Sequence, residues 1–361
     1  MSRFHVLFVL PTRGGGGGAN SVAQEAMGLS RMGVQATVAV NAANAAAFSA
    51  SYPELRHKAV AVTAFDDAAS LGKEMASADI ACATTCGSVS LIEAALSTIP
   101  EEARRPKLAY YVQDYEPLFH DIDTPVWREA FASYTRLPQA QLFAKTDWIR
   151  AMVEANHQVT VAKVDPSIDH EIFFPDLARP LGGTTTVVAM LRPRTSRRGP
   201  YRTARLLAWL AKTYGDAVAI EVFGTSDREL ATFGIELPST AINHGPLRRT
   251  EVPEVLRRAD LFLDLSDYQA FGRTALEAMA CGCNVVVPVL GGAGEFARHG
   301  WNAFVVDTRS DAEVKAAIGA FMAMDAKDRD EMRLNALATA ADFTVEKAAL
   351  SELRLFRAML A

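Results

Sequence analysis

The chain has 361 residues, enough for two domains at roughly 150 residues each. Hydrophobic residues make up 50% of the sequence and charged residues 22%, which excludes a disordered or fibrous protein. The formal net charge of -5 argues against a basic nucleic-acid-binding protein, so we expect no nucleic-acid partner.

The sequence also indicates where the protein works. We find no apolar run of the ~18 residues that a membrane-spanning helix needs, and the apolar run over residues 1–10 is too short for a signal peptide. The four cysteines form two close pairs, Cys82 with Cys86 and Cys281 with Cys283, without C-x-x-C spacing or a nearby histidine. This pattern predicts buried free thiols in a cytoplasmic protein, with no metal site and no transmembrane segment.

Short apolar runs alternate with amphipathic segments over the first 170 residues. Residues 4–10 are rich in Val, Leu and Phe and precede the glycine run 14–18, which predicts a buried parallel strand followed by a tight turn. Further strands are predicted at 35–40, 79–83, 108–112 and 159–163, and helices at 21–32, 88–96 and 148–154. Strand, helix and strand in succession form a βαβ unit with parallel strands.

The same alternation restarts after residues 165–175, which contain two prolines and no clear periodicity and are predicted to be a linker. Strands are predicted at 184–191, 218–223, 261–265, 284–288 and 303–306, and helices at 201–213, 275–280, 311–324 and 345–360. The pattern predicts an α/β fold with two doubly wound, Rossmann-like domains, 1–170 and 171–343, followed by a C-terminal helix at 344–361. Ligands are expected at the carboxyl ends of the strands, in the cleft between the domains.

The most informative segment is residues 266–287, which lies between two predicted strands. Gly272 precedes a predicted helix that contains Glu277. The free amides at such a helix start bind anions, and a carboxylate close by can accept hydrogen bonds from two ribose hydroxyls. On spacing alone, an ordinary crossover with a tight turn explains the segment equally well.

This segment resembles the signature of glycosyltransferase family 4, enzymes of GT-B architecture that transfer a sugar from a nucleotide-sugar donor. The matching residues are Phe271-Gly272 and Glu277-Ala278-Met279-Ala280-Cys281-Gly282, with further matches at 165–175, 291–295 and 299–302. The resemblance covers nearly the whole chain and is thinner before residue 140. It implies that domain 1–170 binds the acceptor, that domain 171–343 binds the donor, and that helix 344–361 packs back toward the N-terminal domain. It also implies retention of anomeric configuration and no metal requirement.

Basic residues follow the predicted strand at 184–191. Arg192 and Arg197 keep the spacing of the two cations that hold the donor diphosphate in the family, and Arg198 is an alternative to Arg197. Fixed cations stabilise the negative charge that the leaving nucleoside diphosphate gains as the glycosidic bond breaks. A solvated basic loop is the alternative interpretation.

The resemblance supplies the remaining candidate residues. The predicted catalytic residues are Arg192, Arg197, Gln113, Asp114, Gln269 and Glu277. The predicted donor-binding residues are Gly16, Gly17, Gly18, Arg198, Gly245, Phe271, Gly272, Arg273, Thr274 and Glu277. The implied partners are a nucleotide-diphosphate sugar, used as co-substrate without a further cofactor, and a saccharide or lipid-linked acceptor. The sequence around Gln113 and Asp114 is similar to that of a subset of the family that includes rhamnosyltransferases of surface-polysaccharide pathways.

Two positions depart from the family pattern. Gln269 replaces the first of two glutamates, and Gln113 replaces a histidine, so both keep hydrogen-bonding ability and lose charge or basicity. Our hypothesis is that Gln269 is a neutral contact to the donor sugar. A non-catalytic GT-B homologue that acts as a scaffold or partner subunit is the first alternative. An NAD-dependent oxidoreductase is the second, and it is disfavoured because no acidic residue ends the second strand, which runs into Asn41.

Overall fold

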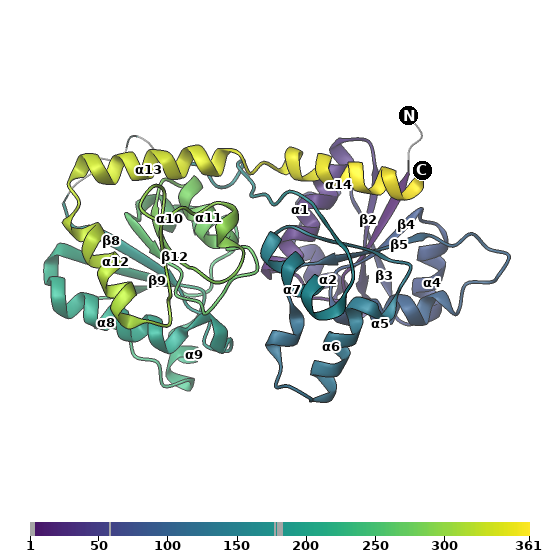
Figure 1. Cartoon of the computed structure of the whole chain (residues 1–361), viewed down its shortest axis with the longest axis horizontal. Coiled ribbons are helices and arrows are strands. Elements are labelled where there is room, and N and C mark those ends of the chain that lie inside the picture. Colours follow the sequence, from purple (N-terminus) through teal and green to yellow (C-terminus); the bar gives the residue numbers. More distant parts are fainter. Residues whose placement is uncertain (1–3, 58, 177, 179–182) are drawn as a thin grey trace. The chain divides into compact units, whose positions relative to one another are not determined.

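The computed structural model describes residues 4–57, 59–176, 178 and 183–361, so the first three residues of the N-terminal apolar run lie outside it. The chain divides into two compact units. We call residues 1–167 with 344–361 the N-terminal unit, and residues 168–343 the C-terminal unit. Each unit contains one parallel β-sheet with helices against it (Figure 1), which confirms the predicted α/β class.

Within the described residues, the N-terminal unit contains a seven-stranded sheet in the order β3-β2-β1-β4-β5-β6-β7. The strands are β1 (His5–Val9), β2 (Gln35–Asn41), β3 (Ala61–Phe65), β4 (Ile80–Ala83), β5 (Lys107–Val112), β6 (Gln141–Ala144) and β7 (Val161–Lys163). All residues of β1 and β4 are buried, which explains why these central strands are apolar without alternation.

Helices cover this sheet and include the last helix of the chain. They are α1 (Gly17–Arg31), α2 (Ala42–Ser51), α3 (Glu54–His57), α4 (Ala68–Ala76), α5 (Cys86–Leu96), α6 (Pro125–Arg136), α7 (Asp147–His157) and α14 (Val345–Leu360), with a 3₁₀ turn at Glu116–Phe119. Helix α14 packs against α1 (Figure 1). A side chain at Gly28 would come within 2.8 Å of the Ala349 Cβ atom, so this glycine permits the close approach of the two helices.

The C-terminal unit contains, among the described residues, a six-stranded sheet in the order β10-β9-β8-β11-β12-β13. The strands are β8 (Thr185–Met190), β9 (Val218–Phe223), β10 (Ile242–Asn243), β11 (Leu261–Leu263), β12 (Asn284–Pro288) and β13 (Phe304–Val306). The helices are α8 (Pro200–Tyr214), α9 (Asp227–Thr232), α10 (Val252–Arg258), α11 (Arg273–Ala280), α12 (Asp311–Ala323) and α13 (Ala326–Ala341), with 3₁₀ turns at Ser196–Arg198, Gly215–Ala217 and Gly292–Glu295.

Three predicted features differ from the structure. Helix α1 begins at Gly17, inside the predicted glycine turn, because its first turn closes by the hydrogen bond from the Asn20 amide to the Gly16 carbonyl. The predicted helix 311–324 ends at Ala323, and α13 follows it, since the Asp325 side chain caps a new helix start. Cys86 is only half-buried, although the four cysteines were predicted to be buried; all four are free thiols.

The strand orders locate the topological switch point of each sheet, where successive strands begin to be added on the opposite side. This point lies between β1 and β4 in the N-terminal sheet and between β8 and β11 in the C-terminal sheet. Doubly wound sheets bind ligands beyond the carboxyl ends of the strands at these switch points. In the C-terminal unit, the loops that follow β8 and β11 are therefore the first place to look for a site. These loops contain Arg192, Arg197 and Gln269.

Candidate functional site

The loops after β8 and β11 contact each other directly. The Asp267 amide donates a hydrogen bond to the Arg197 carbonyl at 2.7 Å. The Arg197 guanidinium lies over the Tyr268 ring, 5.3 Å from its centroid. Arg192 is exposed at the end of β8, and Arg198 is half-buried in the 3₁₀ turn that precedes α8. The fold thus brings the predicted diphosphate-binding loop beside the loop of Gln269.

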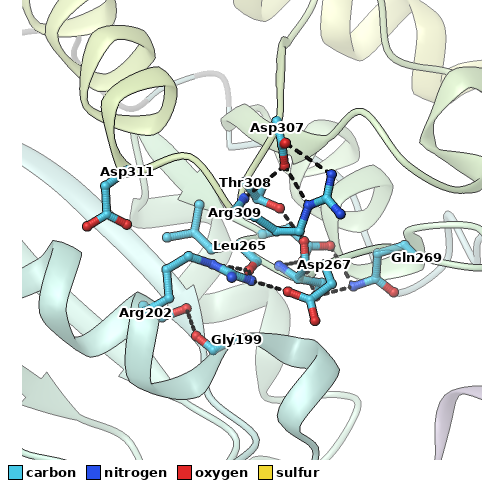
Figure 2. Close-up of polar contacts among 12 residues, drawn as sticks. Gly199, Arg202, Leu265, Asp267, Gln269, Asp307, Thr308, Arg309 and Asp311 are labelled. Carbon is cyan, nitrogen blue, oxygen red and sulfur yellow. Dashed lines mark hydrogen bonds and ion pairs between the residues drawn. The ribbon is translucent and has the colours of Figure 1, made fainter.

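Arg202 of α8 holds the loop after β11 from below (Figure 2). Its Nη2 atom donates to the Leu265 carbonyl at 2.7 Å and to the Asp267 Oδ1 atom at 2.6 Å, and its Nε atom donates to the same carbonyl at 3.2 Å. Gly199 lies against this contact at a φ of +60°. A Cβ atom there would lie 2.5 Å from both the Arg202 Nη2 atom and the Leu265 oxygen, so only glycine fits.

A second contact reaches the same loop from beyond β13. The Thr308 hydroxyl is buried and donates to the Ser266 carbonyl at 2.5 Å (Figure 2). Arg309 next to it pairs with Asp307 at 2.9 Å. The loop after β11 is therefore fixed by a side chain of helix α8, by a side chain of the loop after β13 and by the main chain of Arg197.

Gln269 belongs to a buried polar cluster with Asp264 and Ser266. The Gln269 Nε2 atom donates to the Asp264 Oδ2 atom at 2.7 Å and to the Ser266 hydroxyl at 3.0 Å. Ser266 donates to the Asp264 Oδ1 atom through its amide at 3.2 Å and its hydroxyl at 2.6 Å. The main chain of Gln269 is fixed as well, because its carbonyl accepts from the Gly292 amide at 2.7 Å.

Glu277 lies on α11, whose N-cap Gly272 has a φ of +95°. The Glu277 carboxyl group is buried, and this burial raises its pKa to about 7. The positive charges of Arg273 and Arg249 oppose that rise, and the negative charge of Asp169 adds to it. Arg249 pairs with Asp169 at 3.0 Å. Glu277 therefore lies among two arginines and a second carboxylate, in a site that can bind polar groups.

The other candidates of the C-terminal unit have structural contacts of their own. Phe271 packs edge-to-face against Phe296, with ring centroids 5.7 Å apart. Gly245 follows β10, and its carbonyl accepts a hydrogen bond from the Gly224 amide at 2.8 Å. Thr274 lies in the first turn of α11 and is half-buried. Among the described residues, no group of three or more His, Cys, Asp or Glu side chains is placed to hold a metal ion.

In the N-terminal unit, two predicted site elements meet at the switch point. The Gln113 Nε2 atom donates to the Thr84 carbonyl at 2.8 Å, just beyond β4. A Cβ atom at Gly18 would lie 3.0 Å from the Gln113 Oε1 atom, so this glycine admits the Gln113 side chain against the start of α1. Gly16 is the N-cap of α1 and Gly17 its first residue. The Asp114 Oδ1 atom accepts a hydrogen bond from the Tyr115 amide at 2.9 Å.

Comparison with known proteins assigns part of the chain to a family. Residues 235–338 match the family described as "Glycosyl transferases group 1". These residues form a glycosyl transferases group 1 domain. The domain contains Glu277, Gln269 and the start of α11, the same segment that resembles family 4 in sequence.

Two curated relatives match the chain in sequence. The O-antigen biosynthesis protein RfbC of Myxococcus xanthus is 30% identical over 177 residues, which cover 49% of this chain and 13% of that protein. Mannosylfructose-phosphate synthase of Agrobacterium fabrum is 42% identical over 57 residues, which cover 16% of this chain and 13% of that protein. Each match thus spans about an eighth of the length of the curated relative.

Solved structures show that the group 1 domain is part of a complete GT-B fold. HepE of Anabaena, solved in complex with UDP and glucose, matches with a TM-score of 0.80 and 18% identity, covering 99% of this chain and 100% of that one. Sucrose-phosphate synthase of Thermosynechococcus elongatus matches with a TM-score of 0.80 and 14% identity, covering 99% of both chains. The predicted GT-B fold is therefore confirmed.

The sequence did not indicate three groups of polar residues that lie beside the segment 266–287 or contact it. Asp264 directly follows β11, a position at which polar residues are typical of ligand sites. It was missed because the segment singled out in the sequence begins at residue 266. Arg202 was missed because it is one of several arginines between residues 192 and 205, and the sequence does not distinguish it from the others. The Arg249 pair with Asp169 joins residues 80 positions apart, so no local pattern indicates it.

Arg202→Met tests whether Arg202 fixes the loop after β11. Three charge-assisted hydrogen bonds are lost, two to the Leu265 carbonyl and one to Asp267, so we expect about 1.5–3 kcal/mol of destabilisation and faster hydrogen exchange of the Asp267 amide. Arg205→Met is the matched control, because Arg205 is on the same helix, 60% exposed, and pairs only with Asp311 among the contacts found in the described residues. Equal exchange rates in the two variants would show that Arg202 does not hold the loop.

Proposed function

We propose that this chain is a glycosyltransferase that transfers a sugar from a nucleotide-diphosphate sugar to a hydroxyl of a saccharide or lipid-linked acceptor. The observation that carries the proposal is the contact of the Arg197 loop with the loop after β11, through the Asp267 amide and the Tyr268 ring, in the unit whose helix α11 contains the buried Glu277. The group 1 domain, and relatives named for O-antigen biosynthesis and mannosylfructose-phosphate synthesis, support the same reaction class. Synthesis of a surface polysaccharide or glycoconjugate is the proposed context, and we keep the cytoplasm as its proposed location.

The donor diphosphate is proposed to bind between the loop after β8 and the start of α11. Arg192 and Arg197 follow β8, and the amides of Gly272, Arg273 and Thr274 are at the start of α11, where the helix dipole favours negative charge. As the bond between the sugar and the diphosphate breaks, the diphosphate oxygens gain negative charge. Cations and fixed N–H groups stabilise that charge most strongly in the transition state, which lowers the barrier to transfer.

Gln269 and Glu277 cannot form a pair of carboxylates for general acid and base catalysis, because one of them is an amide. We therefore propose that assistance to the leaving diphosphate drives the reaction. Retention of anomeric configuration and activity without a metal ion are parts of the proposal that rest on the family resemblance. NMR of the product anomer tests the first, and turnover measured in the presence of EDTA tests the second.

Glu277 is proposed to bind the donor ribose, and its pKa of about 7 makes this testable by pH. The ionised carboxylate accepts two hydroxyl hydrogen bonds, and the neutral acid accepts fewer. The diphosphate of a nucleotide sugar is esterified at both ends and does not titrate between pH 6 and 8. We therefore expect nucleotide-sugar affinity to increase as the pH is raised from 6 to 8, and Glu277→Gln to abolish this increase. Calorimetric titration at several pH values measures both proteins.

A comparison with 2′,3′-dideoxynucleoside diphosphates serves as the control for the role of Glu277. A site that bonds a hydroxyl discriminates strongly against the analogue that lacks it. If Glu277→Gln kept both the pH dependence and the preference for ribose, Glu277 would be a structural helix residue.

The proposed acceptor site is on the N-terminal unit, near Gly14–Gly18 and Gln113–Asp114, and Gly16, Gly17 and Gly18 of this loop are proposed to contact the donor as well. The contact of Gln113 with Thr84 and Gly18 supports this place, because it fixes an amide at the carboxyl end of the sheet. Gln113→Ala is expected to raise the KM for the acceptor without changing nucleoside diphosphate affinity.

A non-catalytic GT-B homologue is the second candidate function, favoured by the neutral residues at positions 113 and 269. A thermal-shift screen with UDP-, GDP- and dTDP-sugars tests both candidates for donor binding, since a ligand that binds only the native state raises the melting temperature. Release of nucleoside diphosphate from the sugar that binds then separates an enzyme from a silent homologue.

A further inference from the structure

The hydrogen bonds of Gln269 fix which end of its amide is available. Both N–H bonds of its Nε2 atom are used, one by the Asp264 carboxylate and one by the Ser266 hydroxyl. In Figure 2, dashed lines run from the nitrogen of the Gln269 amide, and the oxygen lies on the other side of the amide. The residues Asp264, Ser266 and Gln269 are 7%, 2% and 6% exposed, so water does not compete freely with these bonds.

Asp264 decides the orientation of the amide. A carboxylate only accepts hydrogen bonds, so it attracts the NH₂ group of Gln269 and repels the carbonyl oxygen. Ser266 donates its own amide and hydroxyl to the other carboxylate oxygen, which leaves Oδ2 to Gln269. The reversed amide would bring Oε1 to the position now held by Nε2, 2.7 Å from Oδ2, with two acceptors facing each other. No hydrogen bond to Oε1 of Gln269 is found in the described part of the chain.

We infer that Asp264 is a positioning residue that makes Gln269 a neutral hydrogen-bond acceptor for a hydroxyl of the donor sugar. The inference rests on the proposed function, because the sugar is the ligand that Oε1 would contact. A glutamine held in this way presents an oxygen, as a glutamate would, without adding a second charge beside Asp264. It also explains why an amide is compatible with activity at this position.

The same geometry explains why glutamate does not fit at position 269 in this chain. Its carboxylate would face the Asp264 carboxylate at hydrogen-bond distance in a buried site, and two like charges there cannot both ionise without a large cost. The main chain cannot move to relieve the contact. Gly291 lies so close that a Cβ atom on it would be 2.0 Å from the Gln269 carbonyl oxygen.

A charge-exchange cycle tests the inference. The proteins are the wild type, Gln269→Glu, Asp264→Asn and the double variant. In the double variant, the asparagine introduced at position 264 donates from its amide nitrogen to the new carboxylate and still accepts from Ser266, so the bond is kept with the roles exchanged. We expect Gln269→Glu alone to lower the Tm by about 4–8 °C at pH 7.5. The decrease should be smaller at pH 5, where the added carboxyl group becomes protonated. The double variant should recover most of the loss.

Donor binding is measured on the same proteins, with UDP-, GDP- and dTDP-glucose as probes. We expect the double variant to bind the preferred probe within about threefold of the wild type, because an acceptor oxygen is still presented. Gln269→Met, which has similar length and no amide, should lose about tenfold. If Gln269→Met bound the probe as the wild type does, Gln269 would not contact the sugar, and that part of the inference would be overturned.

The two readouts separate this inference from the proposed function. If Gln269→Glu lowered the Tm equally in the presence and absence of Asp264→Asn, the two residues would not be coupled and the inference would be wrong even if the enzyme is active. If the wild type bound no nucleotide sugar while the Tm cycle showed strong coupling, the Asp264–Gln269 geometry would stand. The proposed function, and with it the sugar contact, would then be refuted.

Discussion

Lys145→Met is expected to destabilise the N-terminal unit by about 3–5 kcal/mol. Lys145 follows β6, and its Nζ atom forms an ion pair with Glu25 of α1 and lies 3.8 Å from Glu352 of α14. The three side chains are 5%, 1% and 0% exposed. Removal of the lysine leaves the Glu25 carboxylate buried without its cation, next to the Glu352 carboxyl group, which explains the large effect. Denaturant unfolding, followed by a probe in the N-terminal unit, measures it.

Glu352→Gln is the matched comparison, and its effect should have a different sign. Burial and the neighbouring Glu25 hold the pKa of Glu352 well above its usual value, although Lys145 opposes this. Tyr111, which donates to Glu25 at 3.4 Å, and the buried Cys82 are the other titratable groups of the cluster. A carboxyl group whose pKa is higher in the folded state takes up a proton on folding, so its contribution to stability decreases as the pH rises above its unfolded pKa of about 4.3.

The glutamine stays neutral at every pH, so Glu352→Gln should be at least as stable as the wild type at pH 8, and its advantage should disappear toward pH 4. Glu346→Gln on the same helix is the control. Glu346 is 62% exposed and pairs with Arg31, so a change below about 1 kcal/mol is expected. A loss in Glu352→Gln as large as that in Lys145→Met would show that Glu352 is ionised in the folded protein.

Arg192→Ala is expected to weaken both nucleoside diphosphate binding and turnover by roughly tenfold or more. The physical reason is the loss of a charged hydrogen bond to phosphate, which contributes about 1.5–3 kcal/mol. Arg194→Ala is the matched control on the same loop. Arg194 is 76% exposed and pairs with Glu229 at 2.6 Å, so we expect its removal to leave the affinity unchanged. Equal affinities of the two variants for every nucleoside diphosphate would remove Arg192 from the site.

The sequence was sufficient to predict the α/β class, the GT-B fold and most of the strands that form the two switch points. Strands buried on both faces give continuous apolar runs, as in β12, which was predicted with the bounds it has in the structure. The bounds of β9, which is only partly buried, were predicted as well. The edge strands β3 and β10, the interior strand β6 and several helices were missed, namely α2, α3, α4, α6, α9, α10 and α13. Edge strands are more exposed and lack that pattern, and the boundary between α12 and α13 depends on a single cap at Asp325.

The candidate site could be predicted only where its residues follow one another in the chain. The segment from Phe271 to Glu277 was found because a helix start and a nearby carboxylate form a local pattern. The contacts of Arg202 with Leu265 and of Asp169 with Arg249 join distant segments, and only the folded chain brings them together. The sequence suggested only that Gln269 is a neutral contact to the donor sugar, and its hydrogen bond to the Asp264 carboxylate became visible only in the structure.

The central claim is that this chain transfers a sugar from a nucleotide-diphosphate sugar by using the C-terminal unit as its donor site. The most direct measurement is the release of nucleoside diphosphate from the nucleotide sugar that gives the largest thermal shift, with and without a panel of saccharide acceptors. The account predicts release by the wild type, faster release with an acceptor, and at least tenfold slower release by Arg192→Ala than by Arg194→Ala. No release from any donor by a folded wild type that binds nucleotide, or equal rates in the two arginine variants, would contradict it.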